Sequence, residues 1–152
     1  MSEEIKKGLL GIVVDETTIS HVVPELSALT YRGYKVQDLC DKCDFEEVAY
    51  LVLHGELPSK AQLKKFSKEE KSNRKLSKTI IKNIEQMPKN AHPMDVIRTC
   101  VSLMALEDKE TSNSSSEANM RKALRIFAKT PTALAAFYRI RSGKKIILQK
   151  QT

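Results

Sequence analysis

The sequence predicts a mainly α-helical fold with a small β-ribbon at its N-terminus. Three observations support this prediction. Apolar residues recur at the three- and four-residue spacing of amphipathic helices between residues 36 and 143. Short β-branched runs occur within the first 35 residues. The 152 residues include only five Gly and five Pro, few for a turn-rich β architecture.

The chain is predicted to have three parts. Residues 1–35 form the ribbon and its lead-in, residues 36–143 form a helical body, and residues 144–152 form a basic tail. In the ribbon, we expect strands at 8–15 and 17–23 with a turn at Asp15 and Glu16, and a third strand at 29–32. The tail carries Lys144, Lys145 and Lys150 and is expected to lack an apolar partner, either because it is disordered or because the helical body is cut short there.

The helical body is predicted as a series of separate helices, each with a start or stop signal. Asp44 and Ser59 are expected to cap helices, Ser77 or Leu76 to begin one, and Gly55 and Gly143 to end them. Thr130 and Pro131 are expected to divide the last helix in two, and residues 109–116 to form a mobile polar loop. The expected ranges are 35–42, 45–53, 60–71, 77–87, 94–107, 116–129 and 132–142.

The predicted helix 94–107 is apolar on two faces. One stripe consists of Met94, Ile97, Val101 and Met104, and the other of Val96, Cys100 and Leu103. We therefore expect this helix deep in the core or in a subunit interface. Asp95 and Arg98 lie three residues apart on the same helix, so we expect them to form a buried ion pair at such an interface.

Charge and hydropathy favour a cytosolic protein without nucleic acid or membrane as partners. The net charge of +7 raises nucleic-acid binding as a hypothesis. The lysines, however, are spread along the chain and mixed with Glu, which indicates solvated helix faces. No run approaches the roughly 20 apolar residues that span a bilayer, and the polar N-terminus does not resemble a secretory signal.

The three cysteines do not predict a metal site or a cofactor. Cys40 and Cys43 have the C-x-x-C spacing of zinc and redox sites, but zinc needs about four ligands and there is no second pair. A thioredoxin-like role requires the motif at the start of a helix, whereas here it lies at the end of a predicted one. We expect Cys40, Cys43 and Cys100 to be reduced structural thiols.

Five short strings occur in the order and at the approximate spacing of a known family. They are GLLGIVVDET (8–17), YRGYKVQDL (31–39), FEEVAYLVLHGELP (45–58), HPMDVIRT (92–99) and YRIRSG (138–143). Together they resemble the N-terminal segment of citrate synthases and 2-methylcitrate synthases, in the shorter bacterial and archaeal form.

The resemblance implies a helical large domain, a small domain, and a dimer whose subunits share active sites. The family condenses an acyl-CoA with oxaloacetate, using two His, an Asp and several Arg that lie beyond the position matched by Gly143. We therefore predict no catalytic, cofactor-binding or metal residue here, and no activity of this chain alone. Acetyl-CoA or propionyl-CoA and oxaloacetate would bind only the full-length enzyme, and this segment does not distinguish citrate from 2-methylcitrate.

The resemblance also places the helices at about 77–87 and 94–107 in a homodimer seam. Two alternatives remain from other functional classes. One is a helical interaction or dimerisation module without chemistry, and the weaker one is a basic nucleic-acid-binding protein.

Four polar residues invite a functional interpretation. His21 is expected to be exposed on a strand and His54 to lie at a helix C-terminus. His92, at a helix start, is expected to cap the helix or to make a buried hydrogen bond. In some members the region around the matching HPM string contributes to an NADH site, which leaves a ligand role for His92 open. Arg32 is expected to be structural, in the turn between the ribbon and the first helix.

Overall fold

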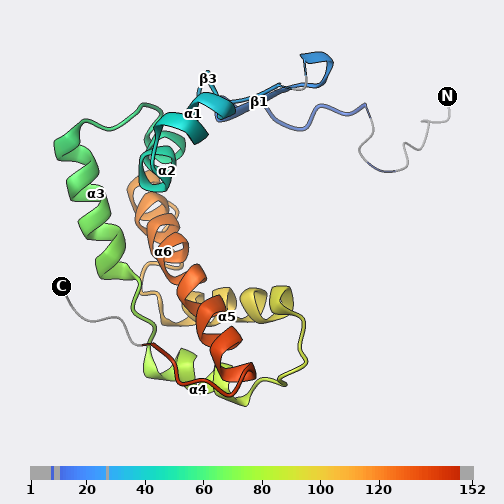
Figure 1. Cartoon of the computed structure of the whole chain (residues 1–152), viewed down its shortest axis with the longest axis vertical. Coiled ribbons are helices and arrows are strands. Elements are labelled where there is room, and N and C mark those ends of the chain that lie inside the picture. The colour runs from blue at the N-terminus through green and yellow to red at the C-terminus, as the bar shows by residue number, and fades with distance from the viewer. Residues whose placement is uncertain (1–7, 9–10, 27, 148–152) are drawn as a thin grey trace. The chain divides into compact units, whose positions relative to one another are not determined.

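The structure of the chain is a computed structural model that describes residues 8, 11–26 and 28–147. Within these residues it contains six α-helices and one three-stranded sheet (Figure 1). The mainly helical fold with a small ribbon is therefore confirmed. The chain divides into two compact units, residues 1–63 and 64–152, and each is described by itself.

The ribbon of the first unit is an antiparallel meander of three short strands. β1 (Ser20–Val23) pairs with β2 (Ala28–Tyr31), which pairs in turn with β3 (Tyr34–Lys35). A short 3₁₀ turn, Pro24–Leu26, joins the first two strands. Strand β2 confirms the strand that was predicted at 29–32.

The turn between β2 and β3 has two residues, Arg32 and Gly33. Both have positive φ, at 48° and 86°, and the flanking Tyr31 and Tyr34 face each other across the pair of strands. Positive φ at both positions is the geometry of a type I′ hairpin, whose twist matches that of the strands. Gly33 adopts it freely, whereas Arg32 does so at a steric cost.

The predicted hairpin between 8–15 and 17–23 is wrong within the described residues. Residues 12–17 are not in a strand, and Val13 and Val14 are 86% and 71% exposed. Leu9 and Leu10 lie outside the described residues. A β-branched run forms a strand only where another backbone satisfies its hydrogen bonds, and β2 does this for residues 20–23 alone.

Two helices follow the ribbon, α1 (Val36–Lys42) and α2 (Phe45–His54). The predicted cap of α2 is confirmed, because the Asp44 N–H donates to Glu47 Oε2 at 2.7 Å in a capping box. The helix stops at Gly55, which has a φ of 93° and donates its N–H to the Leu51 carbonyl.

Helix α2 is unevenly buried. Leu51 is fully buried and Tyr50 is 9% exposed, but Phe45 is 68% exposed.

The next helix, α3 (Lys60–Asn73), begins directly after its predicted cap, Ser59. The Ser59 Oγ accepts from the Gln62 N–H at 3.3 Å, and the Gln62 side chain accepts from the Ser59 N–H at 2.8 Å.

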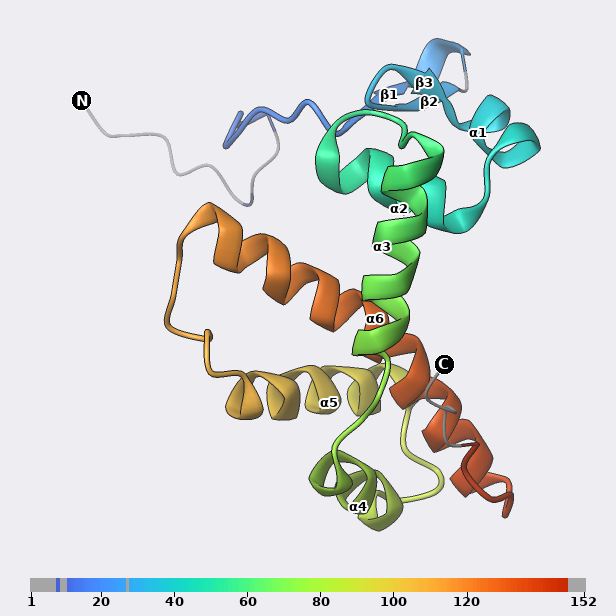
Figure 2. The ribbon, with the colours of Figure 1, turned by 90° about the vertical axis from the view of Figure 1, so that its left-hand side faces the viewer.

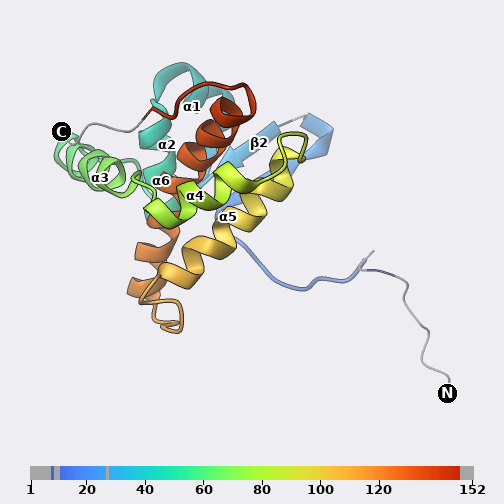
Figure 3. The same ribbon diagram turned by 90° about the horizontal axis from the view of Figure 1, so that it is seen from below.

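The second unit is built on α4 (Lys78–Gln86), α5 (Pro93–Glu107) and α6 (Ser116–Arg141). Figures 2 and 3 show α4 and α5 packed together against the C-terminal half of α6. Each helix has a side-chain cap at its start. The side chains of Ser77, His92 and Ser115 accept hydrogen bonds from the N–H groups of Ile80, Met94 and Ala118.

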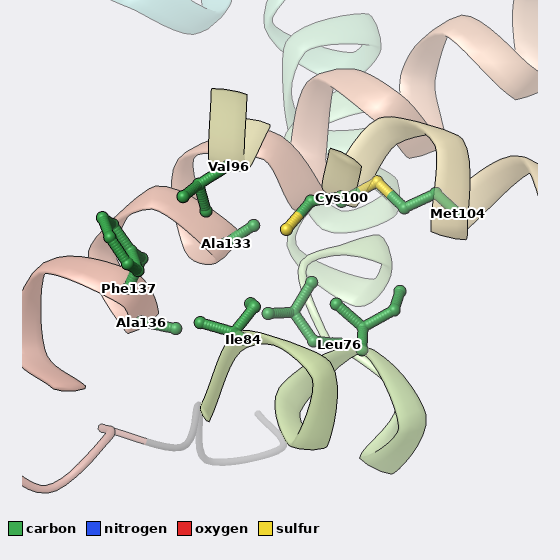
Figure 4. Close-up of a cluster of buried hydrophobic side chains, with 9 residues drawn as sticks. Leu76, Ile84, Val96, Cys100, Met104, Ala133, Ala136 and Phe137 are labelled. Carbon is green, nitrogen blue, oxygen red and sulfur yellow. The ribbon is translucent and has the colours of Figure 1, made fainter. Parts of the chain in front are cut away.

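The core of this unit lies where the three helices meet (Figure 4). The largest of its fully buried side chains, Ile80, Ile84 and Phe137, are at most 1% exposed. Ala133 and Ala136 of α6 are also buried, and their small side chains allow the other helices to approach closely. The full cluster is Leu76, Ile80, Ile84, Val96, Cys100, Met104, Ala133, Ala136 and Phe137.

Helix α6 is continuous, so the predicted break at Thr130 and Pro131 is wrong. A proline inside a helix removes one backbone donor and disfavours the preceding turn. The buried residues Ala128, Ala133 and Phe137 lie on both sides of Pro131. Packing on both sides holds the backbone helical through the proline, which the local sequence could not show.

Helix α5 buries one side, which is formed by residues of both predicted stripes. Val96, Cys100 and Met104 are buried, whereas Met94 is 62% exposed and Ile97 and Val101 are half-buried. We call the latter three residues the uncovered face of α5.

The predicted tail also differs, because Ile146 packs against the core cluster although it was expected to have no apolar partner.

Replacing Phe137 with Ala should lower the free energy of unfolding by about 3–5 kcal/mol, because it removes a fully buried ring at the helix junction. The matched control is Tyr138→Ala, since Tyr138 is the next residue of α6 and is 61% exposed. That change should stay within about 0.5 kcal/mol of the wild type. Urea unfolding followed by circular dichroism measures both, and equal losses would place Phe137 outside the core.

Candidate functional site

Charged side chains gather where α5 ends and α6 begins, within the second unit. The connecting loop supplies Asp108 and Glu110, and the first turns of α6 supply Arg121 and Arg125. Their separation in sequence is 11 to 17 residues, so no local helical spacing predicts the pairing. We call these four residues the α5–α6 clasp.

Arg125 holds two carboxylates at once. Its Nε donates to Asp108 Oδ2 at 2.8 Å and its Nη2 to Asp108 Oδ1 at 3.0 Å. The same Nη2 donates to Glu110 Oε2 at 2.9 Å. The planar guanidinium group of arginine binds a carboxylate through two parallel hydrogen bonds. This bidentate pair fixes the position of the loop relative to α6.

The loop is tied down by two more side chains of α6. Arg121 donates to both oxygens of Glu110, from Nε at 3.1 and 3.2 Å and also from Nη2. Lys122 Nζ donates to the carbonyl of Asn113 at 2.6 Å. The segment was expected to be a mobile polar loop, but the structure gives it partners along α6.

These contacts shift the protonation of both carboxylates. Hydrogen bonds from Arg121 and then Arg125 lower the pKa of Glu110 from its ordinary value of 4.5 to about 2. At Asp108, burial acts to raise the pKa, but bonds from the Glu110 N–H and from Arg125 outweigh it and leave the pKa lowered. Both groups are therefore held as anions.

Two hollows adjoin the clasp. One is a small cavity of about 80 Å³ and the other a wider, open cleft of about 470 Å³. Met104, Asp108, Arg125 and Lys129 line both. Because the carboxylates are already paired with arginines, neither is placed to move a proton at neutral pH. The arrangement suits a structural tie between loop and helix better than acid–base chemistry.

The three histidines lie on three separate elements. His21 is exposed on β1, as predicted. His54 is the last residue of α2, also as predicted, and its ring stacks on Tyr50 with the centroids 4.1 Å apart. His92 caps α5, as predicted, with its Nδ1 accepting from the Met94 N–H at 3.2 Å.

Arg32 has the structural role that the sequence predicted. Its Nη1 donates to Thr18 Oγ1 at 2.7 Å, and its Nη2 donates to the Val52 carbonyl on α2 at 3.1 Å. The backbone N–H of Arg32 also donates to the Ile19 carbonyl at 2.8 Å. One side chain thus connects the ribbon to α2, which offsets the cost of its left-handed backbone.

Asp95 and Arg98 form the predicted ion pair, at 2.8 Å, but it is not buried in this chain. The two side chains are 61% and 80% exposed. An exposed pair of this kind contributes little to stability. Whether a second subunit covers it stays a prediction.

The described residues give no sign of a metal centre or a membrane span. In residues 8, 11–26 and 28–147, no three His, Cys, Asp or Glu side chains are grouped so that they could hold a metal ion. Among the same residues, none of the helices combines the length and apolar character needed to cross a bilayer. Cys40, Cys43 and Cys100 are free thiols, and Cys100 lies in the core.

Comparison with known proteins assigns the family. A family model described as "Citrate synthase, C-terminal domain" matches residues 8–152. The chain belongs to the citrate synthase family. It is 50% identical over 139 residues to a citrate synthase of Mycolicibacterium smegmatis, and 46% identical over 140 residues to a 2-methylcitrate synthase of Mycobacterium tuberculosis.

Structural comparison leads to the same family. The crystal structure of citrate synthase from Thermotoga maritima MSB8 matches with a TM-score of 0.82 at 32% identity, over 97% of this chain and 38% of that one. The matches to the two mycobacterial synthases cover 91% and 92% of this chain. The chain spans 37% and 35% of the length of these two relatives.

The clasp is the feature of this citrate synthase family member that sequence reasoning missed. Arg121 and Arg125 are four residues apart on one face of α6, and two carboxylates precede them in the loop. This sequence pattern is compatible with ion pairs, but it does not show which carboxylate each arginine binds, because either arginine could equally face solvent. Only the turn of the chain between α5 and α6 brings the charges together (Figure 2).

Replacing Glu110 with Gln should remove a pH-dependent part of the stability. A pKa lowered in the folded state stabilises the fold above the unfolded value near 4.5, and this stabilisation is lost as the pH falls toward 2. The stability difference between wild type and Glu110→Gln should therefore be largest above pH 4.5 and should close toward pH 2.

The matched control is the same substitution in a chain that already carries Arg121→Met and Arg125→Met. There the pH-dependent difference should vanish, because the lowered pKa of Glu110 comes from these two arginines. Urea midpoints at several pH values measure all four proteins. A difference that persists unchanged to pH 2 would contradict the clasp.

Proposed function

We propose that this chain is the N-terminal, mainly scaffolding part of an enzyme that condenses an acyl-CoA with oxaloacetate. The observation that carries the proposal is the family match over residues 8–152, combined with a span of only 37% of the first relative. The charged residues of the clasp form structural ties, and we assign the chemistry to parts of the enzyme outside this chain. The product would be citrate or 2-methylcitrate.

The acyl group stays open in this proposal. The identities to a citrate synthase and to a 2-methylcitrate synthase are 50% and 46%, too close to favour one substrate. A pocket that distinguishes one methylene would also provide only a modest preference. The cytosol remains the expected compartment of the enzyme.

The proposal is tested by transplanting the chain. In the Mycolicibacterium smegmatis citrate synthase, the region that aligns with this chain is replaced by the chain itself. The chimera should condense acetyl-CoA with oxaloacetate, whereas the isolated chain should release no CoA. A rate from the isolated chain near the enzyme median of about 10 per second would contradict the scaffolding role.

The matched control is the chimera with His21, His54 and His92 all changed to Gln. If these residues cap, stack or face solvent, the rate should stay within about threefold of the unmodified chimera. A well-folded triple variant without activity would show that a histidine of this chain takes part in the reaction.

We also propose that the chain self-associates as a homodimer through the helices at about 77–87 and 94–107. The uncovered face of α5 supports this role, since Met94, Ile97 and Val101 lie together and are incompletely buried. We expect α4 to contribute less to this dimer interface than α5, because Ile80 and Ile84 of α4 are already fully buried in the core of the same chain. The same face supports the second candidate function, a helical interaction module without chemistry.

Replacing Ile97 with Asp should shift the chain from dimer to monomer, because pairing would then bury an unpaired charge. The control is Ser102→Asp, on the exposed side of the same helix. Light scattering from micromolar concentrations upward should give a dimer for wild type and control. A wild-type mass of 17.2 kDa throughout would show that the seam is absent.

A further inference from the structure

Two thiols lie three residues apart where α1 ends. Cys40 is in the last turn of α1 and is exposed, and Cys43 is the C-cap and is half-buried. Cys100, in contrast, is 1% exposed within the core cluster. Packing accounts for Cys100 but not for an exposed cysteine such as Cys40.

The backbone places Cys40 and Cys43 at a separation suited to a disulfide. The two residues between them, Asp41 and Lys42, are both helical, which sets the Cα atoms of the cysteines about 5 Å apart. Disulfides join Cα atoms about 4.4–6.8 Å apart. Cys43 has already left the helix, with φ −122° and ψ 146°, so the helical direction does not fix its side chain.

Lys42 immediately precedes Cys43 in the chain and carries a positive charge. Lys42 is bonded to Asp38 at 2.9 Å, and this bond is the main cause of the raised pKa of Lys42. Attraction to Cys43 adds to the same shift. A lysine next in sequence to Cys43 would favour negative charge on that sulfur during thiol–disulfide exchange.

We propose that Cys40 and Cys43 form a dithiol that small-molecule disulfides oxidise to an intramolecular disulfide. One cysteine thiolate attacks a sulfur of the small disulfide, which forms a mixed disulfide and releases one small thiolate. The other cysteine thiolate then attacks the protein sulfur of that mixed disulfide and releases the second small thiolate. The two cysteines lose two protons and two electrons, and the small disulfide is reduced to two thiols.

The new disulfide would link the last turn of α1 covalently to Cys43, in the short connection between α1 and α2. Leu39, next to Cys40, is 3% exposed and anchors α1, which packs on β2 and β3. Oxidation would thus fix the end of α1 within the first unit. Cys100, which burial keeps protonated by raising its pKa, would take no part.

The test uses dithiobis-nitrobenzoate, an aromatic disulfide whose released thiolate absorbs visible light. The reduced 152-residue chain should quickly release two thiolates and retain no reagent, so that its mass falls by about 2 Da. Cys40→Ser and Cys43→Ser should each release one thiolate and keep the reagent as a mixed disulfide. Cys100→Ser, the matched control, should behave in this fast phase as the wild type does.

Three results would overturn the proposal. Two reagent groups retained on the wild-type chain would show that the sulfurs do not meet. Covalent dimers in place of the internal bond would show that the thiols pair between chains. Reaction of Cys40 and Cys43 as slow as that of Cys100 would show that they are not accessible. Circular dichroism of the serine variants checks that each one keeps its helices.

Discussion

The junction of α4, α5 and α6 is the interaction on which the second unit depends. Ile80 and Ile84 from α4, Cys100 from α5 and Phe137 from α6 are all at most 1% exposed. None of these helices can bury its apolar stripe alone, so each requires the other two. The alanines of α6 set how closely they approach, and the same packing keeps α6 helical through its proline.

The junction also determines what the second unit presents to a partner. The side chains of Val96, Cys100 and Met104 are buried in the core. Those of Ile97 and Val101, on a neighbouring side of the same helix, are therefore only half-buried. The clasp on Arg125 then fixes the loop that joins α5 to α6. One apolar face of α5 is therefore left partly bare, which supports the scaffolding role proposed above.

Local signals in the sequence predicted much of this structure. Helical spacing located the helices, and capping residues such as Asp44, Ser59 and His92 indicated where several of them begin. Five short strings pointed to the family before any comparison. Arg32 and the three histidines also lie in the kinds of position expected, because their roles depend on neighbours close in sequence or on one helix end.

The features that were predicted wrongly or missed depend on contacts with distant parts of the chain. Periodicity gave α5 two apolar faces but could not show which of their residues are buried, since that depends on α4 and α6. Pro131 was interpreted as a break because its buried neighbours were not visible in sequence. The partners of Arg121 and Arg125 lie 11 to 17 residues away across a turn. Strand β3 has two residues, too few for a pattern.

Native-state hydrogen exchange tests the central claim most directly, that α4, α5 and α6 share one core and open together. Amides of Ile84, Cys100 and Phe137 should be the slowest in the second unit and should exchange with one common free energy of opening. If α5 exchanged well before α4 and α6, or if each helix opened at its own free energy, the three helices would be stable separately. That result would contradict a shared junction as the basis of the second unit.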